Sequence, residues 1–140
     1  ANTTTNRKNR KQSIRIMKIF YFFVFLFFFV NCKSQAFITQ KEFSKKTKNG
    51  IVVIEFYAEF NDENKFQELD KLKDCKTYRV DIQKCTDIKK EYKIKSIPTV
   101  LIFDNGKETK RYIANIMLQL EATKKEIQGE IDKINLKKFQ

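Results

Sequence analysis

Apolar and polar positions after residue 35 follow two alternating patterns, one typical of strands and one of helices. The residues Ile51–Tyr57 form a continuous β-branched and aromatic run, as expected for a strand that is buried on both faces of a sheet. The Asn-Gly pair within Asp104–Lys107 suits the positive φ angles of a tight hairpin turn. The pattern predicts five strands, over Ala36–Ile38, Ile51–Tyr57, Thr77–Ile82, Thr99–Phe103 and Glu108–Ile113.

Helical patterns separate these strands. Thr39–Glu42 reads as a capping box, so we predict a helix over about 39–47 that ends before Asn49–Gly50. Further helices are predicted over Asn64–Leu72, where apolar side chains recur every third residue, and over Asp87–Tyr92. The last predicted helix has a core-facing stripe of Ile116, Met117, Leu120, Ile127, Ile131 and Ile134. This order of elements predicts an α/β domain with helices on both faces of a sheet.

The first thirty-five residues have a different character. Residues 1–16 are rich in Asn, Thr, Lys and Arg without apolar periodicity, and we expect them to be disordered. Ile19–Val30 contains twelve apolar residues without a charge, which would span about 18 Å as a helix, whereas a bilayer core is about 30 Å thick. Preceded by Met17–Lys18, this run indicates the hydrophobic region of a signal peptide more than a transmembrane or core helix.

Cys32 directly follows the apolar run. The segment Val30–Gln35 resembles the lipobox of bacterial lipoprotein signal peptides, which makes Cys32 a candidate for lipidation, although Asn31 is larger than the residue usual before that cysteine. Ordinary cleavage near Ser34 or Ala36 and an uncleaved short anchor are the alternatives. We therefore expect an extracytoplasmic protein, either membrane-anchored or secreted, with a leader over 1–35 and a folded domain over 36–140.

Charge and composition exclude several classes of function. The net charge is +12, but residues 1–35 carry seven of the basic residues and no acidic one. The rest of the chain has 22 basic and 17 acidic residues in mixed order, as in Lys89–Glu91. This mixture argues against a nucleic-acid-binding domain. There is no histidine, and Cys32, Cys75 and Cys85 form no C-x-x-C pair, so we expect no metal site and no cofactor.

Several segments of the predicted domain resemble the thioredoxin family, over about residues 36–135. The matching segments are Val53–Phe60, Tyr78–Ile82, Tyr92–Thr99 with its Ile-Pro-Thr motif, and Phe103–Gly106 with its Asn-Gly turn. The resemblance implies the thioredoxin fold, in which a central mixed sheet of four to five strands is flanked by helices on both faces. It also implies a cis peptide bond before Pro98; a trans bond at a strand edge is the alternative.

The chain departs from this family where the cysteine pair should lie. The corresponding loop is Phe60, Asn61, Asp62, Glu63 and Asn64. Disulfide exchange requires a thiolate that attacks and a second thiol that resolves the mixed disulfide, and an amide does neither. We expect Asn61, Asp62 or Asn64 to cap the following helix instead.

The resemblance also suggests roles for residues around this loop. Glu55 stands at the position of the family's buried acid, and Arg79 at that of its lysine partner. They either form a buried ion pair, or Glu55 is partly exposed without a partner. Family substrates lie extended beside the cis proline, and here that groove would contain Ile97, Pro98 and Thr99, with Ala114 in place of a usual glycine.

Three functions are consistent with this sequence. The first is a redox-inactive domain that binds a protein or extended peptide in the groove beside Pro98. The second is an enzyme, a thiol oxidoreductase that uses Cys85 or Cys75 singly. The sequence favours the first, because the chain lacks the cysteine pair that disulfide exchange needs. The segment between Cys75 and Cys85 is also too extended for a disulfide, so we expect two unpaired thiols. The third is a structural subunit of a membrane assembly, held by the N-terminal segment or its lipid.

Overall fold

One mixed sheet organises residues 36–139, which are the residues described by the computed structural model. Its strands lie in the order β2-β1-β3-β4. The α-helices are α2 (Gln40–Thr47), α3 (Thr86–Glu91) and α4 (Lys124–Lys137). The strands are β1 (Ile51–Tyr57), β2 (Lys76–Asp81), β3 (Thr99–Asp104) and β4 (Lys107–Ile113), and two short 3₁₀ helices are η1 (Glu59–Asn64) and η2 (Leu69–Lys71).

The pairing of the strands explains why β1 is so apolar. β1 pairs in parallel with β2 and antiparallel with β3, and β4 returns antiparallel to β3. The turn between β3 and β4 places Asn105 and Gly106 at φ angles of 50° and 84°, as predicted from this pair. The predicted strand Ala36–Ile38 is reduced to a single parallel bridge between Phe37 and Arg79. The α/β fold with a four-stranded mixed sheet is therefore confirmed.

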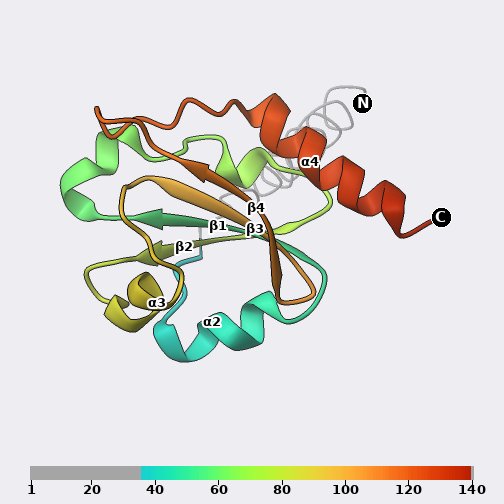
Figure 1. Ribbon diagram of the computed structural model, residues 1–140, viewed down its shortest axis with the longest axis horizontal. Helices are drawn as coiled ribbons and strands as arrows, with labels where there is room; N and C mark the ends of the chain where they lie inside the picture. The colour runs from blue at the N-terminus through green and yellow to red at the C-terminus, as the bar shows by residue number, and fades with distance from the viewer. Residues whose placement is uncertain (1–35, 140) are drawn as a thin grey trace, which may run out of the picture. The chain divides into compact units, whose positions relative to one another are not determined.

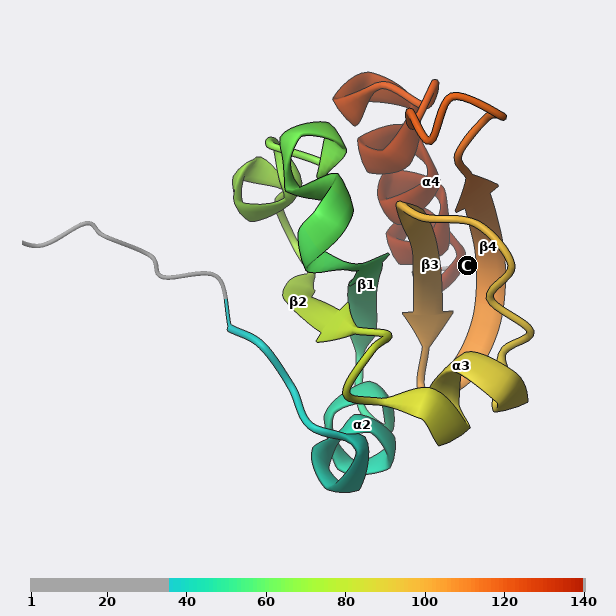
Figure 2. The ribbon, with the colours of Figure 1, turned by 90° about the vertical axis from the view of Figure 1, so that its left-hand side faces the viewer.

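Helices cover both faces of the sheet (Figures 1 and 2). On one face, Phe43 of α2 and Ile88 of α3 pack against the side chains of β1 that include Ile54 and Phe56. On the other face, α4 contributes a buried stripe. That stripe consists of Ile127, Ile131 and Ile134. The helices predicted over 39–47 and 87–92 are confirmed to within one residue at each end, and Glu42 accepts a hydrogen bond from the Thr39 N–H at 3.0 Å.

The prediction of a helix over Asn64–Leu72 is wrong. This segment contains the end of η1, an irregular stretch and the three residues of η2. The backbone of Phe66 lies at its centre and is held by two charged side chains from the sheet. The Phe66 N–H donates to Oε1 of Glu55 at 2.5 Å, and its carbonyl accepts from Nη2 of Arg79 at 2.9 Å. The Phe66 N–H is thus not available for a helical bond, while its carbonyl accepts from Arg79 and, in a single turn, from the Leu69 N–H at 3.3 Å.

The last helix is shorter than predicted, because it begins only at Lys124. Oδ1 of Asn115 accepts from the N–H groups of Met117 and Gln119, at 2.9 and 3.1 Å, and this local bonding competes with a helix. The φ of Leu118 is 57°, which also interrupts it. Ile116 is 100% exposed and Met117 is 68% exposed, so neither faces the core as predicted. Leu120 lies outside the helix, but it packs against the same buried cluster as Ile127.

The predictions for residues 1–35, including those for Ile19–Val30 and Cys32, lie outside the described residues. Between residues 36 and 139, no helix combines the length and apolar character needed to cross a bilayer.

Candidate functional site

The predicted site residues gather at one end of the sheet. Strands β1 and β2 finish there, β3 starts there after Pro98, and β4 finishes there before Ala114. In Figure 1 this is the left-hand end, where the loop from β1 to η1 and the loops before β3 and after β4 approach one another. Residues far apart in the sequence thus reach one site through the sheet topology.

Asn61 connects three of these loops. Its side chain is buried, and its Nδ2 donates to the carbonyl of Ile97 at 3.2 Å and to that of Leu118 at 3.0 Å. Its Oδ1 accepts from Nδ2 of Asn64 at 2.8 Å. The expected helix caps are wrong, because the helix that they would cap does not form and Asn61, Asp62 and Asn64 lie within η1. The Asn61 amide instead fastens its loop to the segment before β3 and to the loop after β4.

The other residues of the loop Phe60–Asn64 face solvent or pair with residues close in the sequence. Phe60 is 69% exposed. Asp62 accepts from Nζ of Lys65 through both carboxylate oxygens, at 2.9 and 2.8 Å. Glu63 is exposed. The loop therefore presents an aromatic ring and acidic groups rather than a nucleophile.

The bond between Ile97 and Pro98 is cis, as the resemblance implied. The side chains of Ile97, Thr99 and Ala114 are all buried. The Ala114 N–H donates to the Pro98 carbonyl at 3.0 Å, and Oγ1 of Thr99 donates to the carbonyl of Ser96 at 2.6 Å. These residues shape the backbone of the site and contribute little side-chain surface to it.

Exposed apolar side chains supply that surface instead. We call them the apolar surface, and they are Phe60, Ile113, Ile116 and Met117, between 55% and 100% exposed. Phe60 precedes Asn61, Met117 precedes Leu118, and Ile113 precedes Ala114 in the chain. Sequence reasoning missed Ile116 and Met117 because it assigned them to the stripe of α4. The capping box formed by Thr123 and Glu126 marks the start of that helix, and the sequence alone contains this pattern.

Beneath the loop, Glu55 and Arg79 form a buried ion pair. Nε of Arg79 lies 2.6 Å from Oε2 of Glu55, which has no exposed side-chain surface. This resolves the two alternatives in favour of the pair. Burial raises the pKa of Glu55, and the Arg79 charge offsets part of that increase. Since both side chains also hold the backbone of Phe66, the pair fixes the segment between η1 and η2 to the sheet.

Both cysteines of the described residues are free thiols. Burial raises the pKa of Cys75 to about 11, and burial also raises the pKa of Cys85. Because the thiolate is the reactive form, neither thiol is prepared for nucleophilic attack at neutral pH.

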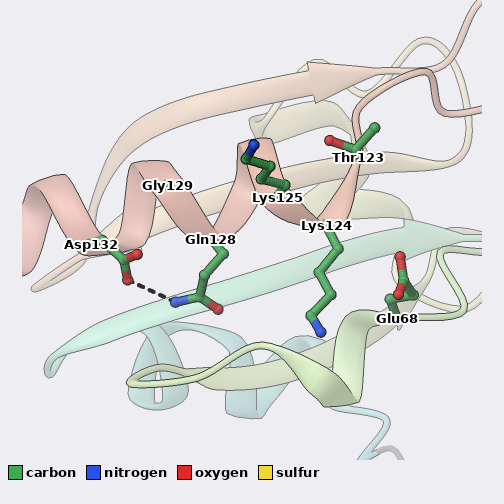
Figure 3. Close-up of a pocket in the computed structure, with 7 residues that line it drawn as sticks. All are labelled: Glu68, Thr123, Lys124, Lys125, Gln128, Gly129 and Asp132. Carbon is green, nitrogen blue, oxygen red and sulfur yellow. Dashed lines mark hydrogen bonds between the residues drawn. The ribbon is translucent and has the colours of Figure 1, made fainter.

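No group of cysteine and acidic side chains within residues 36–139 could hold a metal ion. A shallow cavity of about 640 Å³ lies beside α4 (Figure 3). In it, Nε2 of Gln128 donates to Asp132 at 2.9 Å, while the Gln128 amide also exchanges two hydrogen bonds with the Lys73 backbone. The amide is thus used to attach α4 to the segment before β2.

Comparisons with known proteins agree with the fold. The sequence profile of the thioredoxin family matches residues 34–133. A thioredoxin of Mycoplasmoides gallisepticum is 39% identical over 75 residues, which cover 49% of this chain and 74% of that protein. A mutant thioredoxin from Halobacterium salinarum superposes with a TM-score of 0.56 at 18% identity, covering 71% of this chain and 88% of that one. A Malassezia sympodialis thioredoxin gives 0.56 at 22% identity, with 71% and 90% covered.

Proposed function

The chain belongs to the thioredoxin family, and from this premise we propose that its folded domain is a redox-inactive binding domain. It receives an extended segment of a partner protein beside Pro98. The observation that carries this proposal is the position of the apolar surface, whose side chains stand on the loops joined by Asn61 and at the end of β4.

Two features of the domain support the proposed lack of thiol chemistry. Asn61 and Asn64 occupy the positions of the cysteine pair and are hydrogen-bonded to each other. The thiols of Cys75 and Cys85 have raised pKa values. An insulin-reduction assay with dithiothreitol tests this point. We expect no acceleration by the protein, and an activity abolished by Cys85→Ser or Cys75→Ser would overturn it in favour of a single-cysteine enzyme.

Partner binding is supported by the chemistry of the exposed groups. Solvent-exposed clusters of large apolar side chains mark interaction sites. The N–H of Ile97 has no hydrogen-bond acceptor among residues 36–139, and a partner backbone could supply one by strand addition. The Ile97 carbonyl, in contrast, already accepts from Asn61. We therefore infer that a partner binds mainly through its apolar side chains and through a single backbone bond.

Selection of peptides from a random library on the immobilised full chain tests this binding. We expect the retained peptides to be rich in apolar residues and to lose at least about tenfold in affinity on Phe60→Ser or Met117→Ser. Leu136→Ser is the matched control, because Leu136 is 65% exposed but lies on α4. Peptides that bind all three variants equally, or no retained peptides, would contradict the proposal.

We further propose that the N-terminal segment tethers this domain outside the cytoplasm, through lipid on Cys32 or through Ile19–Val30. The support is the order of basic residues, apolar run and cysteine in the sequence. The intact mass of the native protein tests the lipid: a mature chain beginning at Cys32 with added acyl mass supports it, and an unmodified Cys32 rejects it.

A further inference from the structure

Lysine side chains gather at the end of the sheet opposite to Asn61. This is the right-hand end in Figure 1, where α2 leads into β1, β3 turns into β4, and α4 finishes. We call this the lysine pole. Its members are the exposed lysines of these segments, Lys45, Lys48, Lys76, Lys107, Lys137 and Lys138.

Specific contacts bring these lysines to the same end. Lys76 pairs with Val52 in the sheet, and Lys107 pairs with Asp104 across the hairpin. Nζ of Lys138 lies 2.8 Å from Oδ1 of Asp104, which joins the end of α4 to this hairpin. A Cβ on Gly106 would lie 3.7 Å from Cα of Lys48. Elements distant in sequence thus present one basic surface.

Acidic groups neutralise the pole only in part, at Lys138. Asp104 is paired with Lys138, and Glu108 is paired with Arg111. Asp74, which precedes β2, and Asp132 of α4 are both exposed. The exposed lysines of α2, the hairpin and α4 therefore remain in excess.

Two large apolar side chains accompany the lysines at the end of α4. Leu136 is 65% exposed and Phe139 is 88% exposed, and they flank Lys137 and Lys138 in the sequence. They lie outside the buried stripe that α4 presents to the sheet. Exposed apolar side chains among lysines are typical of surfaces that insert shallowly between lipid headgroups.

We propose that the lysine pole rests on the surface of an anionic lipid bilayer, which directs the Asn61 end of the domain away from the membrane. Lysines near such a surface are attracted to its negative potential, while Leu136 and Phe139 enter the interface. This inference does not depend on partner binding beside Pro98. A nucleic acid fits less well, because Arg79 and Arg111 are both paired with glutamates and the pole offers no arginine fork.

The chain contains no tryptophan, so Phe139→Trp introduces a single fluorescent reporter into the full-length protein. The protein is incorporated into vesicles of phosphatidylcholine alone or of phosphatidylcholine with phosphatidylglycerol, each containing brominated lipid. We expect the tryptophan of Phe139→Trp to be quenched and blue-shifted in the anionic vesicles only. Phe60→Trp, at the opposite end of the sheet, should remain unquenched in both, which separates contact by the pole from anchoring by the N-terminal segment.

Charge removal completes the test. In the Phe139→Trp background, Lys48→Gln, Lys107→Gln and Lys137→Gln together should return quenching to the level seen with phosphatidylcholine alone, as should raised salt. Equal quenching in both vesicle types, or quenching of Phe60→Trp, would overturn the proposal. So would a fluorescence response to single-stranded RNA without a response to anionic vesicles, which would identify the pole as a nucleic-acid surface.

Discussion

Nδ2 of Asn61 lies 3.2 Å from the carbonyl oxygen of Ile97, the residue before the cis proline. The amide therefore uses a backbone acceptor beside the site where family members bind extended substrates. The same nitrogen also donates to Leu118. The Asn61 side chain thus holds the loops of the site together.

Asn61→Ala should destabilise the protein by about 1–3 kcal/mol, because the carbonyls of Ile97 and Leu118 lose a buried donor. Urea unfolding of the full chain followed by circular dichroism measures this loss. The control is Asn49→Ala, since Asn49 is exposed and makes no side-chain hydrogen bond within residues 36–139. Equal stability of the two variants would mean that the Asn61 bonds are not retained in solution.

The paired substitution Asn61→Cys with Asn64→Cys should produce a disulfide, because the side chains at these positions already touch at 2.8 Å. Air oxidation should lower the mass of the double variant by about 2 Da, and insulin reduction should rise above the level of the parent chain. Either single cysteine variant should show neither effect. A double variant whose thiols stay reduced would show that η1 holds the two positions too far apart.

Arg79→Met alone should cost about 3–5 kcal/mol, because it leaves the carboxylate of Glu55 buried without its charged partner. Arg79→Met combined with Glu55→Leu should recover part of that loss, although the Phe66 backbone then lacks both of its partners. The free energies of unfolding of the parent chain, Arg79→Met, Glu55→Leu and the double variant form a double-mutant cycle. Strict additivity of the two single effects would contradict a direct interaction between Glu55 and Arg79.

The strands could be predicted because their pattern is local. The runs over Ile51–Tyr57 and Thr99–Phe103 contain mainly β-branched and aromatic residues, and the Asn105–Gly106 turn specifies its own conformation. The Ile-Pro-Thr motif located the cis proline. These features depend on neighbouring residues, so the sequence shows them without knowledge of the tertiary structure.

Two predicted helices were wrong in extent or existence, one because of contacts between distant residues and one because of a local side chain. The Phe66 N–H is diverted from helical bonding by Glu55, 11 residues away, and Arg79, 13 residues away, holds the Phe66 carbonyl. Asn115 interrupts the stripe of apolar residues through its own side chain. That interruption exposes Ile116 and Met117, so the apolar surface became visible only in the structure.

Glu55 should also make stability depend on pH. Burial raises its pKa in the folded state, so the folded state binds this proton more tightly than the unfolded state. The resulting stabilisation is fully present below the ordinary pKa of 4.5 and is lost as the pH rises through the raised folded value. The stability of the parent chain relative to Glu55→Gln should therefore fall as the pH rises through this window. Urea titrations of both proteins at several pH values measure it, and a constant difference would contradict the raised pKa.

The thiols of Cys75 and Cys85 should react slowly with iodoacetamide in the native protein. With a pKa of about 11, roughly one Cys75 thiol in a thousand is ionised at pH 8, and Cys85 is only 4% exposed. The measurement uses Cys32→Ser, so that only these two cysteines remain, and follows alkylation by mass spectrometry. In urea both thiols should be alkylated at the rate of an ordinary thiol. For Cys75 this rate should be about a hundredfold above its rate in the native protein, because its pKa returns towards 9.0. Fast native alkylation of either residue would reveal an activated thiol and would restore the single-cysteine enzyme as the better interpretation.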